Sequence, residues 1–233
     1  AWTRSTAVTL SLVASDVGVG TLAEMMLSED AAFAGATWTS YLASPTFTLS
    51  SVNGDKTVYA KVRDSAGRES TSRSDGIRLD TEAPAVRAFE FAAGEYVNST
   101  AVSLTLDAVD AVAATTELSY AVSNTAIVCS SYGSWTAMTA VPQTVSHALA
   151  SCNGSRTVYL CVRDAANNRA ARESATVFCD SIAPTAPVLD DALPGSSSVT
   201  LNWTASTDVS GSGVSHYRVT VTPAIGAAYT VES

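Results

Sequence analysis

Two stretches of the 233-residue chain repeat each other. The first, NGDKTVYAKVRDSAGRES, begins at Asn53, and the second, NGSRTVYLCVRDAANNRAARES, begins at Asn153. Other segments match in the same order: RSTAVTLSL with NSTAVSLTL, GATWTSYL with YGSWTAM, and IRLDTEAP with VFCDSIAP. Self-similarity at a fixed period predicts that one structural unit is used at least twice along the chain.

Apolar residues alternate with polar residues inside each unit. In KTVYAKVRD, Val58, Ala60 and Val62 share one face, and Tyr59 and Lys61 lie on the other. This period of two predicts half-buried strands, and NGDK, DSAGR, NGSR and DAANN are turn signals between them. The second unit accommodates strands at residues 85–91, 100–107, 117–123, 134–138, 143–149, 156–163 and 174–180. Their spacing is typical of an all-β sandwich.

Two parts of the chain resemble known module families. TVYAKVRDSAGRES and the following IRLDTEAP resemble the end of a bacterial Ig-like repeat, a module found in series in secreted and surface-anchored bacterial proteins. The segment VTLNWTAS resembles the front of a fibronectin type III module, with Trp203 as its core tryptophan. The resemblance implies an all-β fold of tandem sandwiches in a linear array. The expected units are residues 1–82, 83–183 with disulfides, and a partial module at 184–233.

The first unit has no counterpart of APAVRAFEFAAG, the segment that opens the second unit. The sequence therefore predicts a sandwich that lacks its first strand. Two explanations stay open. The chain is a piece of a longer repeat protein, or its open strand edges are completed by another chain, as in strand exchange.

Composition excludes several classes of protein. The net charge is −9, which argues against a basic groove for nucleic acid or anionic lipid. No apolar run is long enough to span a bilayer. The acidic surface serves solubility, or some of its carboxylates bind calcium.

The cysteines Cys129, Cys152, Cys161 and Cys179 form no CxxC pair, which argues against zinc. An even number of scattered cysteines in a β-rich chain indicates disulfides and an oxidising compartment. Hairpin pairing would bring Cys179 close to Cys152, so we expect Cys152–Cys179 and Cys129–Cys161. The second bridge requires the long loop that carries Cys129 to fold over the outer face of the sheet.

Each unit ends in an aspartate, Asp80 or Asp180, that is separated from an Ala-Pro pair by two residues. Some bacterial Ig-like repeats stiffen their linkers with calcium, so the resemblance implies Asp80 and Asp180 as inter-domain calcium ligands. Calcium requires six to eight hard oxygens. Asp64 and Asp164 follow the VR pair, where turn capping by the side chain explains them without a metal. Asp80 would lie at the opposite end of its unit from Asp64, and would share an ion with loops of the next unit.

Catalytic motifs are absent from the sequence: it contains no GxSxG, HExxH, Walker loop or GxGxxG. His147 and His216 fall in different units and cannot form a metal triad together. We therefore expect a non-enzymatic, secreted or surface-located structural or adhesive segment of a bacterial protein. The alternatives are an accessory region of a secreted enzyme and a subunit of an extracellular filament. Expected partners are a cell-surface protein or glycan, reached through the loop SNTAIVCSSYGSW, or neighbouring copies of the chain.

Overall fold

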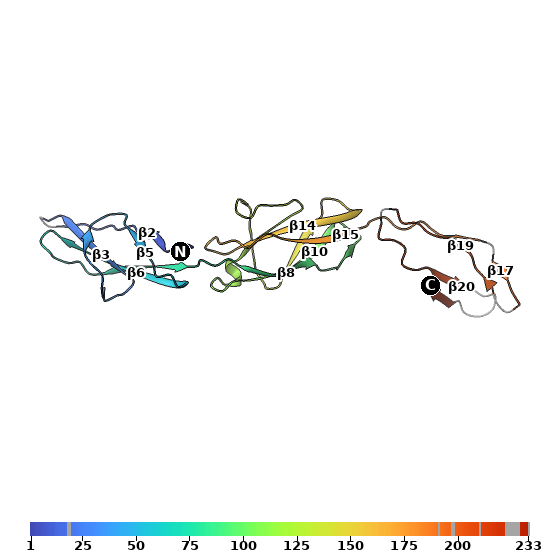
Figure 1. The fold of residues 1–233 in the computed structure, drawn as a ribbon, viewed down its shortest axis with the longest axis horizontal. Coiled ribbons are helices and arrows are strands. Elements are labelled where there is room, and N and C mark those ends of the chain that lie inside the picture. The colour runs from blue at the N-terminus through green and yellow to red at the C-terminus, as the bar shows by residue number, and fades with distance from the viewer. Residues whose placement is uncertain (18–19, 191, 197–198, 210, 222–228, 233) are drawn as a thin grey trace.

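The computed structural model describes residues 1–17, 20–190, 192–196, 199–209, 211–221 and 229–232. Figure 1 shows these residues as three units in a row along the longest axis. We call residues 1–82 module 1, residues 83–183 module 2 and residues 184–233 the C-terminal segment. Apart from one 3-10 turn, η1 (Thr115–Glu117), the regular elements of the described residues are strands. None of the described helices is long and apolar enough to cross a membrane.

Module 2 is a sandwich of two sheets. Its strands are β8 (Ala85–Phe91), β9 (Tyr96–Val97), β10 (Ala101–Val109), β11 (Ser119–Ser123), β12 (Thr136–Ala137), β13 (Gln143–Ala148), β14 (Gly154–Arg163) and β15 (Glu173–Cys179). One sheet has the order β13-β10-β8 and the other β12-β11-β14-β15-β9. All seven predicted strands are confirmed. The two-residue strand β9, which pairs in parallel with β15, was not predicted.

The core of module 2 lies where the two sheets face each other. Leu104 and Leu106 of β10 and Val158 and Leu160 of β14 are fully buried. Every second residue of β10 points inward, as the alternation in NSTAVSLTL predicts.

Module 1 repeats this arrangement with one strand fewer in the smaller sheet. Its strands are β1 (Trp2–Thr3), β2 (Ala7–Thr9), β3 (Leu22–Ser28), β4 (Thr39–Ser40), β5 (Thr46–Thr48), β6 (Gly54–Asp64) and β7 (Arg73–Leu79). The larger sheet has the order β1-β7-β6-β3-β4, and β2 pairs with β5. No strand in the described part of the chain covers the other edge of β2, the position that β8 occupies beside β10. Leu10 and Leu12 are accordingly half-buried, whereas their repeat counterparts Leu104 and Leu106 are fully buried.

Both disulfides of the structure join the expected cysteines. Cys152 is bonded to Cys179, and Cys129 is bonded to Cys161. Residues 124–135 fold over the outer face of the β14 sheet, where Cys161 is fully buried beside Ile127 and Trp135. A cation-π contact also holds this loop, because the Arg163 guanidinium lies 4.6 Å from the centre of the Trp135 ring. Trp38 has the same relation to Arg63 in module 1, at 4.5 Å.

The C-terminal segment contains three short antiparallel pairs in its described residues. They are β16 (Val188–Leu189) with β19 (Trp203–Thr204), β17 (Leu193–Pro194) with β18 (Val199–Thr200), and β20 (Arg218–Val221) with β21 (Tyr229–Glu232). The Trp203 and Tyr217 ring centroids are 5.4 Å apart. Val188 and Leu189 are more than half exposed, so the described residues of the segment bury little apolar surface.

Candidate metal centre at the module junction

Three aspartates from the two modules meet where module 1 joins module 2. Asp80 follows β7 of module 1, while Asp110 and Asp164 follow β10 and β14 of module 2. One carboxylate oxygen of each lies within 4.8 Å of those of the other two. Asp80 is fully buried and Asp164 is 3% exposed. We call these three residues the junction cluster.

Each carboxylate of the cluster uses one oxygen to hold its own loop. Asp80 Oδ1 accepts a hydrogen bond from the Glu82 N–H at 3.1 Å. Asp110 Oδ1 accepts from the N–H groups of Val112 and Ala113, both at 2.8 Å. The second oxygens of Asp80 and Asp110 are buried and have no hydrogen-bond partner in the described part of the chain. A buried carboxylate oxygen without a partner is costly, and in native proteins such groups are paired or bind metals.

Asn168 connects the third carboxylate to module 1. Its N–H donates to Asp164 Oδ1 at 2.9 Å, and its side-chain Nδ2 donates to Asp164 Oδ2 at 2.8 Å. The same Nδ2 donates to the backbone carbonyl of Asp80, also at 2.8 Å. Asp164 therefore caps its turn, as the sequence predicts, and it also lies in the junction cluster.

The cluster concentrates negative charge in a buried place. Burial raises the pKa of the Asp80 carboxyl, and the carboxylates of Asp110 and Asp164 raise this pKa further. Burial also raises the pKa of Asp164, with Asp110 contributing in the same direction. No salt bridge of the described residues includes any of the three. Such a group of carboxylates favours either protonation or a bound cation.

The donor set fits a hard divalent cation. Calcium takes carboxylate and carbonyl oxygens at about 2.3–2.6 Å, so two of its ligands lie up to about 5 Å apart. One carboxylate oxygen from each residue of the junction cluster lies within 4.8 Å of the others, so a single ion of this kind could contact all three. Zinc prefers histidine and cysteine, which are not part of the cluster. Asp80, Asp110 and Asp164 would hold the ion, with carbonyl groups or water completing its shell.

Other contacts bring the two modules together around the cluster. Trp2 of module 1 packs against the core of module 2, and the Arg78 guanidinium covers the Trp2 ring at 4.8 Å. Arg78 also lies 4.0 Å from the carboxylate of Glu117 in module 2. Arg4 donates to the Asn167 carbonyl at 3.3 Å. The junction is therefore a packed interface as well as a linker.

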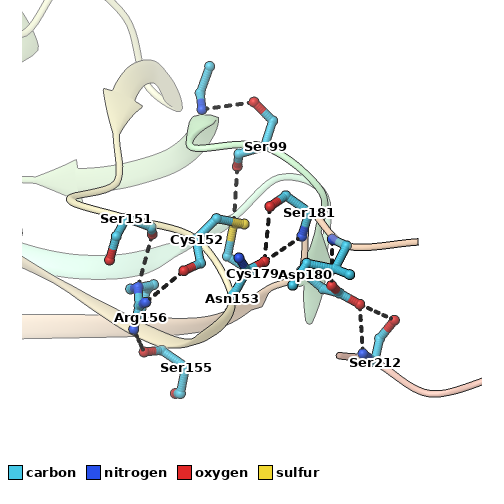
Figure 2. Close-up of a disulfide and its surroundings, with 12 residues drawn as sticks. Ser99, Ser151, Cys152, Asn153, Ser155, Arg156, Cys179, Asp180, Ser181 and Ser212 are labelled. Atoms are coloured by element: carbon cyan, nitrogen blue, oxygen red, sulfur yellow. Dashed lines mark hydrogen bonds between the residues drawn. A yellow bond between two sulfur atoms is a disulfide. The ribbon is translucent and has the colours of Figure 1, made fainter. Parts of the chain in front are cut away.

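The second predicted calcium ligand has a different environment. Asp180 Oδ2 accepts from the N–H and the hydroxyl of Ser212, at 2.7 and 2.9 Å, and Oδ1 accepts from the Ile182 N–H (Figure 2). Hydrogen bonds from Ser212 and Ile182 lower the pKa of the Asp180 carboxyl. No group of three possible metal ligands surrounds it among the described residues. Asp180 Oδ2 thus accepts hydrogen bonds from the protein, whereas Asp80 Oδ2 has no hydrogen-bond donor among the described residues.

The two junctions nevertheless share their linker geometry. Asn53 Oδ1 accepts from the N–H and hydroxyl of Thr81, and Asn153 Oδ1 accepts from the N–H and hydroxyl of Ser181. Figure 2 shows this contact beside the Cys152–Cys179 bridge. Each module end is therefore fixed to the turn that opens its own VYxxVRD strand.

Asp110 was not predicted as a site residue. A signal for it is present in the repeat, because Asp16 and Asp110 both stand six residues beyond the matched Leu10 and Leu104. The two histidines lie apart from the cluster. His147 bonds to Asn124 at 3.0 Å, and its pKa is lowered by burial, while His216 contacts Ser215.

Comparison with known proteins gives likeness of fold only. No protein-family model matches the chain, and no curated protein matches it. Solved structures similar to it include the fibronectin(III)-like modules of Clostridium thermocellum CbhA, with a TM-score of 0.46 and 13% identity over 76% of this chain and 87% of that one. The D00-D0 domain of Intimin has a TM-score of 0.31 and 16% identity over 77% and 95% of the two chains.

A third solved structure, the BSP domain of a biofilm associated protein, has a TM-score of 0.24 and 9% identity over 76% of this chain and 28% of that one. These are β-sandwich modules of the fibronectin or Ig-like kind, and the comparisons identify no catalytic family. The TM-scores of these three structures lie below 0.5, so none of them indicates a function.

Proposed function

We propose that the chain is a non-enzymatic, extracellular spacer of a bacterial surface protein, in which calcium bound by the junction cluster fixes module 2 to module 1. The observation that carries the proposal is the fully buried Asp80, which has one carboxylate oxygen without a hydrogen-bond partner in the described part of the chain and lies beside two carboxylates of the next module. An ion held by ligands from both modules restrains their relative motion, because bending the junction would separate the ligands.

Several features support an extracellular setting for this ion. Two disulfides in about one hundred residues are typical of an oxidising compartment. Calcium sites of extracellular modules commonly have dissociation constants of about 10⁻⁴–10⁻³ M. A site of that affinity is filled outside cells, where calcium is abundant, and empty where it is scarce.

The test compares the chain in calcium and in EDTA by thermal unfolding and small-angle X-ray scattering. At a free calcium concentration one hundred times the dissociation constant, calcium binding stabilises the folded chain against unfolding by about 2.7 kcal/mol. We also expect a narrower distribution of molecular dimensions in calcium. Unfolding and scattering that are both unchanged by millimolar calcium would refute the proposal. Magnesium, which requires a near-octahedral shell, should have a smaller effect.

A matched pair of variants locates the effect. Asp80→Asn and Asp180→Asn each neutralise the carboxylate at the end of one module. Asn keeps an oxygen that can accept the bond from Glu82 or Ile182. We expect Asp80→Asn to abolish the calcium response and Asp180→Asn to retain it. An equal loss in both variants would place the calcium effect outside the junction cluster.

A filament subunit is a second candidate function, favoured by the uncovered edge of β2. A hollow of about 480 Å³ beside that edge is lined by Val8, Leu10, Leu12, Val58 and Ile77, among others. A strand from a neighbouring copy could pair there by β-augmentation. Light scattering tests this candidate, because a monodisperse monomer at micromolar concentration would exclude it.

Two further roles stay proposals. An accessory role in a secreted enzyme would require a catalytic domain elsewhere in the same polypeptide, which the full gene sequence would show. Binding of a cell-surface protein or glycan would involve the loop at residues 123–135. Removing that loop without any change in adhesion would exclude it from binding.

A further inference from the structure

The turns after β6 and β14 have the same backbone conformation. In each, the aspartate N–H donates to the carbonyl four residues later, at 3.1 Å, for Asp64 with Arg68 and for Asp164 with Asn168. A residue with positive φ, Gly67 or Asn167, occupies the same place in both turns. The two turns therefore serve as internal controls for each other.

The turns differ in the group that faces the second carboxylate oxygen. In module 1 the Arg68 Nε donates to Asp64 Oδ2 at 2.7 Å. In module 2 the neutral Asn168 Nδ2 donates to Asp164 Oδ2 at 2.8 Å. A guanidinium thus stands in module 1 where an uncharged amide stands in module 2.

Each turn aspartate, Asp64 or Asp164, also has a second aspartate near it, which lies beyond β2 in module 1 and directly after β10 in module 2. In module 2 this is Asp110. In module 1 it is Asp16, since a Cβ placed on Gly20 would lie 2.4 Å from Asp16 Oδ2 and 3.5 Å from Asp64 Cβ. Both modules therefore place a second aspartate near the turn aspartate. Only module 1 has a guanidinium, that of Arg68, on the turn aspartate.

We propose that the residue four positions after the turn aspartate decides whether a module carries its own positive charge or requires a metal ion. Arg68 supplies the charge in module 1. Asn168 supplies none, so the junction cluster depends on a divalent cation. Asn168 also links the two modules at the cation site, because its side-chain amide donates both to Asp164 Oδ2 and to the Asp80 carbonyl. This inference rests on the proposed function, and it attributes the requirement for a metal ion to residue 168.

Asn168→Arg is the direct test, since it gives module 2 the residue found in module 1. An added guanidinium on Asp164 competes with the metal by charge repulsion. Calcium affinity, measured by titration calorimetry on the whole chain, should fall by at least about tenfold. The melting temperature of the variant in EDTA should equal or exceed that of the wild type in EDTA.

Ala165→Arg is the matched control. It adds the same charge on an exposed residue of the same turn, without placing it on Asp164 Oδ2. We expect it to retain wild-type calcium affinity within about threefold, because exposed charges are strongly screened. Equal losses in Ala165→Arg and Asn168→Arg would overturn the inference, since general charge would then explain both.

The outcomes separate this inference from the proposed function. A wild-type chain that binds no calcium refutes the proposed function. A wild-type chain that binds calcium, together with an Asn168→Arg variant that binds it equally well, refutes only the role of residue 168. If Asn168→Arg does not fold, Asn168→Lys carries the same charge on an unbranched side chain, and the same comparison applies to it.

Discussion

Aspartates at strand ends recur through this chain, and their neighbours give them different properties. Hydrogen bonds from Arg68 lower the pKa of Asp64, those from Ser212 and Ile182 lower that of Asp180, and burial raises that of Asp80. The chemical role of each is therefore set by one or two nearby donors. Asp64 is paired with a guanidinium and Asp180 with a serine, whereas one oxygen of Asp80 has no hydrogen-bond partner among the described residues.

Substitution of Asp110 tests the least expected ligand. Asp110→Asn should keep the turn, because its remaining oxygen still accepts from Val112 and Ala113. Removing one of three carboxylates should weaken calcium binding by at least about tenfold. Asp107→Asn, which neutralises the surface partner of Arg87, is the control and should leave calorimetric affinity unchanged.

The pH dependence of module 1 should reveal Asp64. Its folded pKa lies below its ordinary value, chiefly because of the hydrogen bond from the Arg68 backbone. Its stabilising contribution is therefore fully present above the unfolded pKa of about 3.9 and is lost as the pH falls through the lower folded pKa. Urea unfolding followed on β6 resonances should show this loss in the wild type. Asp64→Asn should lack it, and an identical acid transition in both proteins would contradict the assignment.

At the scale of elements, the alternation of apolar residues predicts most strands and their inward faces. It misses β9 in module 2, whose two residues pair in parallel with the end of β15 and display no period of their own. It also fails for the junction cluster. Asp80 could be proposed from its repeated place before Ala-Pro, but Asp110 comes from another module and only tertiary packing brings it close.

The repeated leucines offer a direct measure of what β8 contributes. Leu104 of β10, which pairs with β8, is fully buried, whereas its repeat counterpart Leu10, directly after β2, is half-buried. Leu104→Ala should destabilise module 2 by about 2–5 kcal/mol. Leu10→Ala should cost module 1 clearly less, since fewer contacts are lost. Equal losses in denaturant unfolding would show that another segment covers Leu10 in solution.

The Cys152–Cys179 bridge should stabilise module 2 without shaping it. The double variant Cys152→Val with Cys179→Leu installs the residues of module 1, Val52 and Leu79, at these places. A bridge with a sequence separation of 27 residues contributes about 3.5 kcal/mol by the loop-entropy relation. We expect a lower midpoint of denaturation with an unchanged circular dichroism spectrum. An unchanged midpoint would argue that the bridge adds nothing to stability.

At the scale of the whole molecule, the described chain is a row of two sandwiches and a C-terminal segment, and its two junctions differ. The first combines the junction cluster with packing of Trp2 and Arg78, and the second has hydrogen bonds between Asp180 and Ser212. Order of the modules along the chain follows from the repeat, but the difference between junctions depends on single side chains. We therefore expect calcium to stiffen the first junction selectively.

Proteolysis can show this selectivity in one experiment. A glutamate-specific protease can cut after Glu82, which is exposed in the first linker and donates its N–H to Asp80. Cutting should be slower in calcium than in EDTA, because a bound ion immobilises Asp80 and its neighbours. Cleavage after exposed Glu95, away from the cluster, is the internal reference and should not change. Calcium protection of both sites alike would indicate a global effect instead.

The position of the Cys152–Cys179 bridge has a mechanical consequence. The chain leaves module 2 at Asp180, directly after Cys179, so a tensile force entering there passes across the sulfur bridge to Cys152. The Cys129–Cys161 bridge overlaps this one in sequence, so the shortest covalent path crosses from Cys129 to Cys161, runs back along β14 to Cys152 and crosses to Cys179. With separations of 32 and 27 residues, the two bridges together would make an unfolding module 2 release about 130 Å less length than an unbridged module. Under load, the two modules of this chain would therefore extend by different amounts.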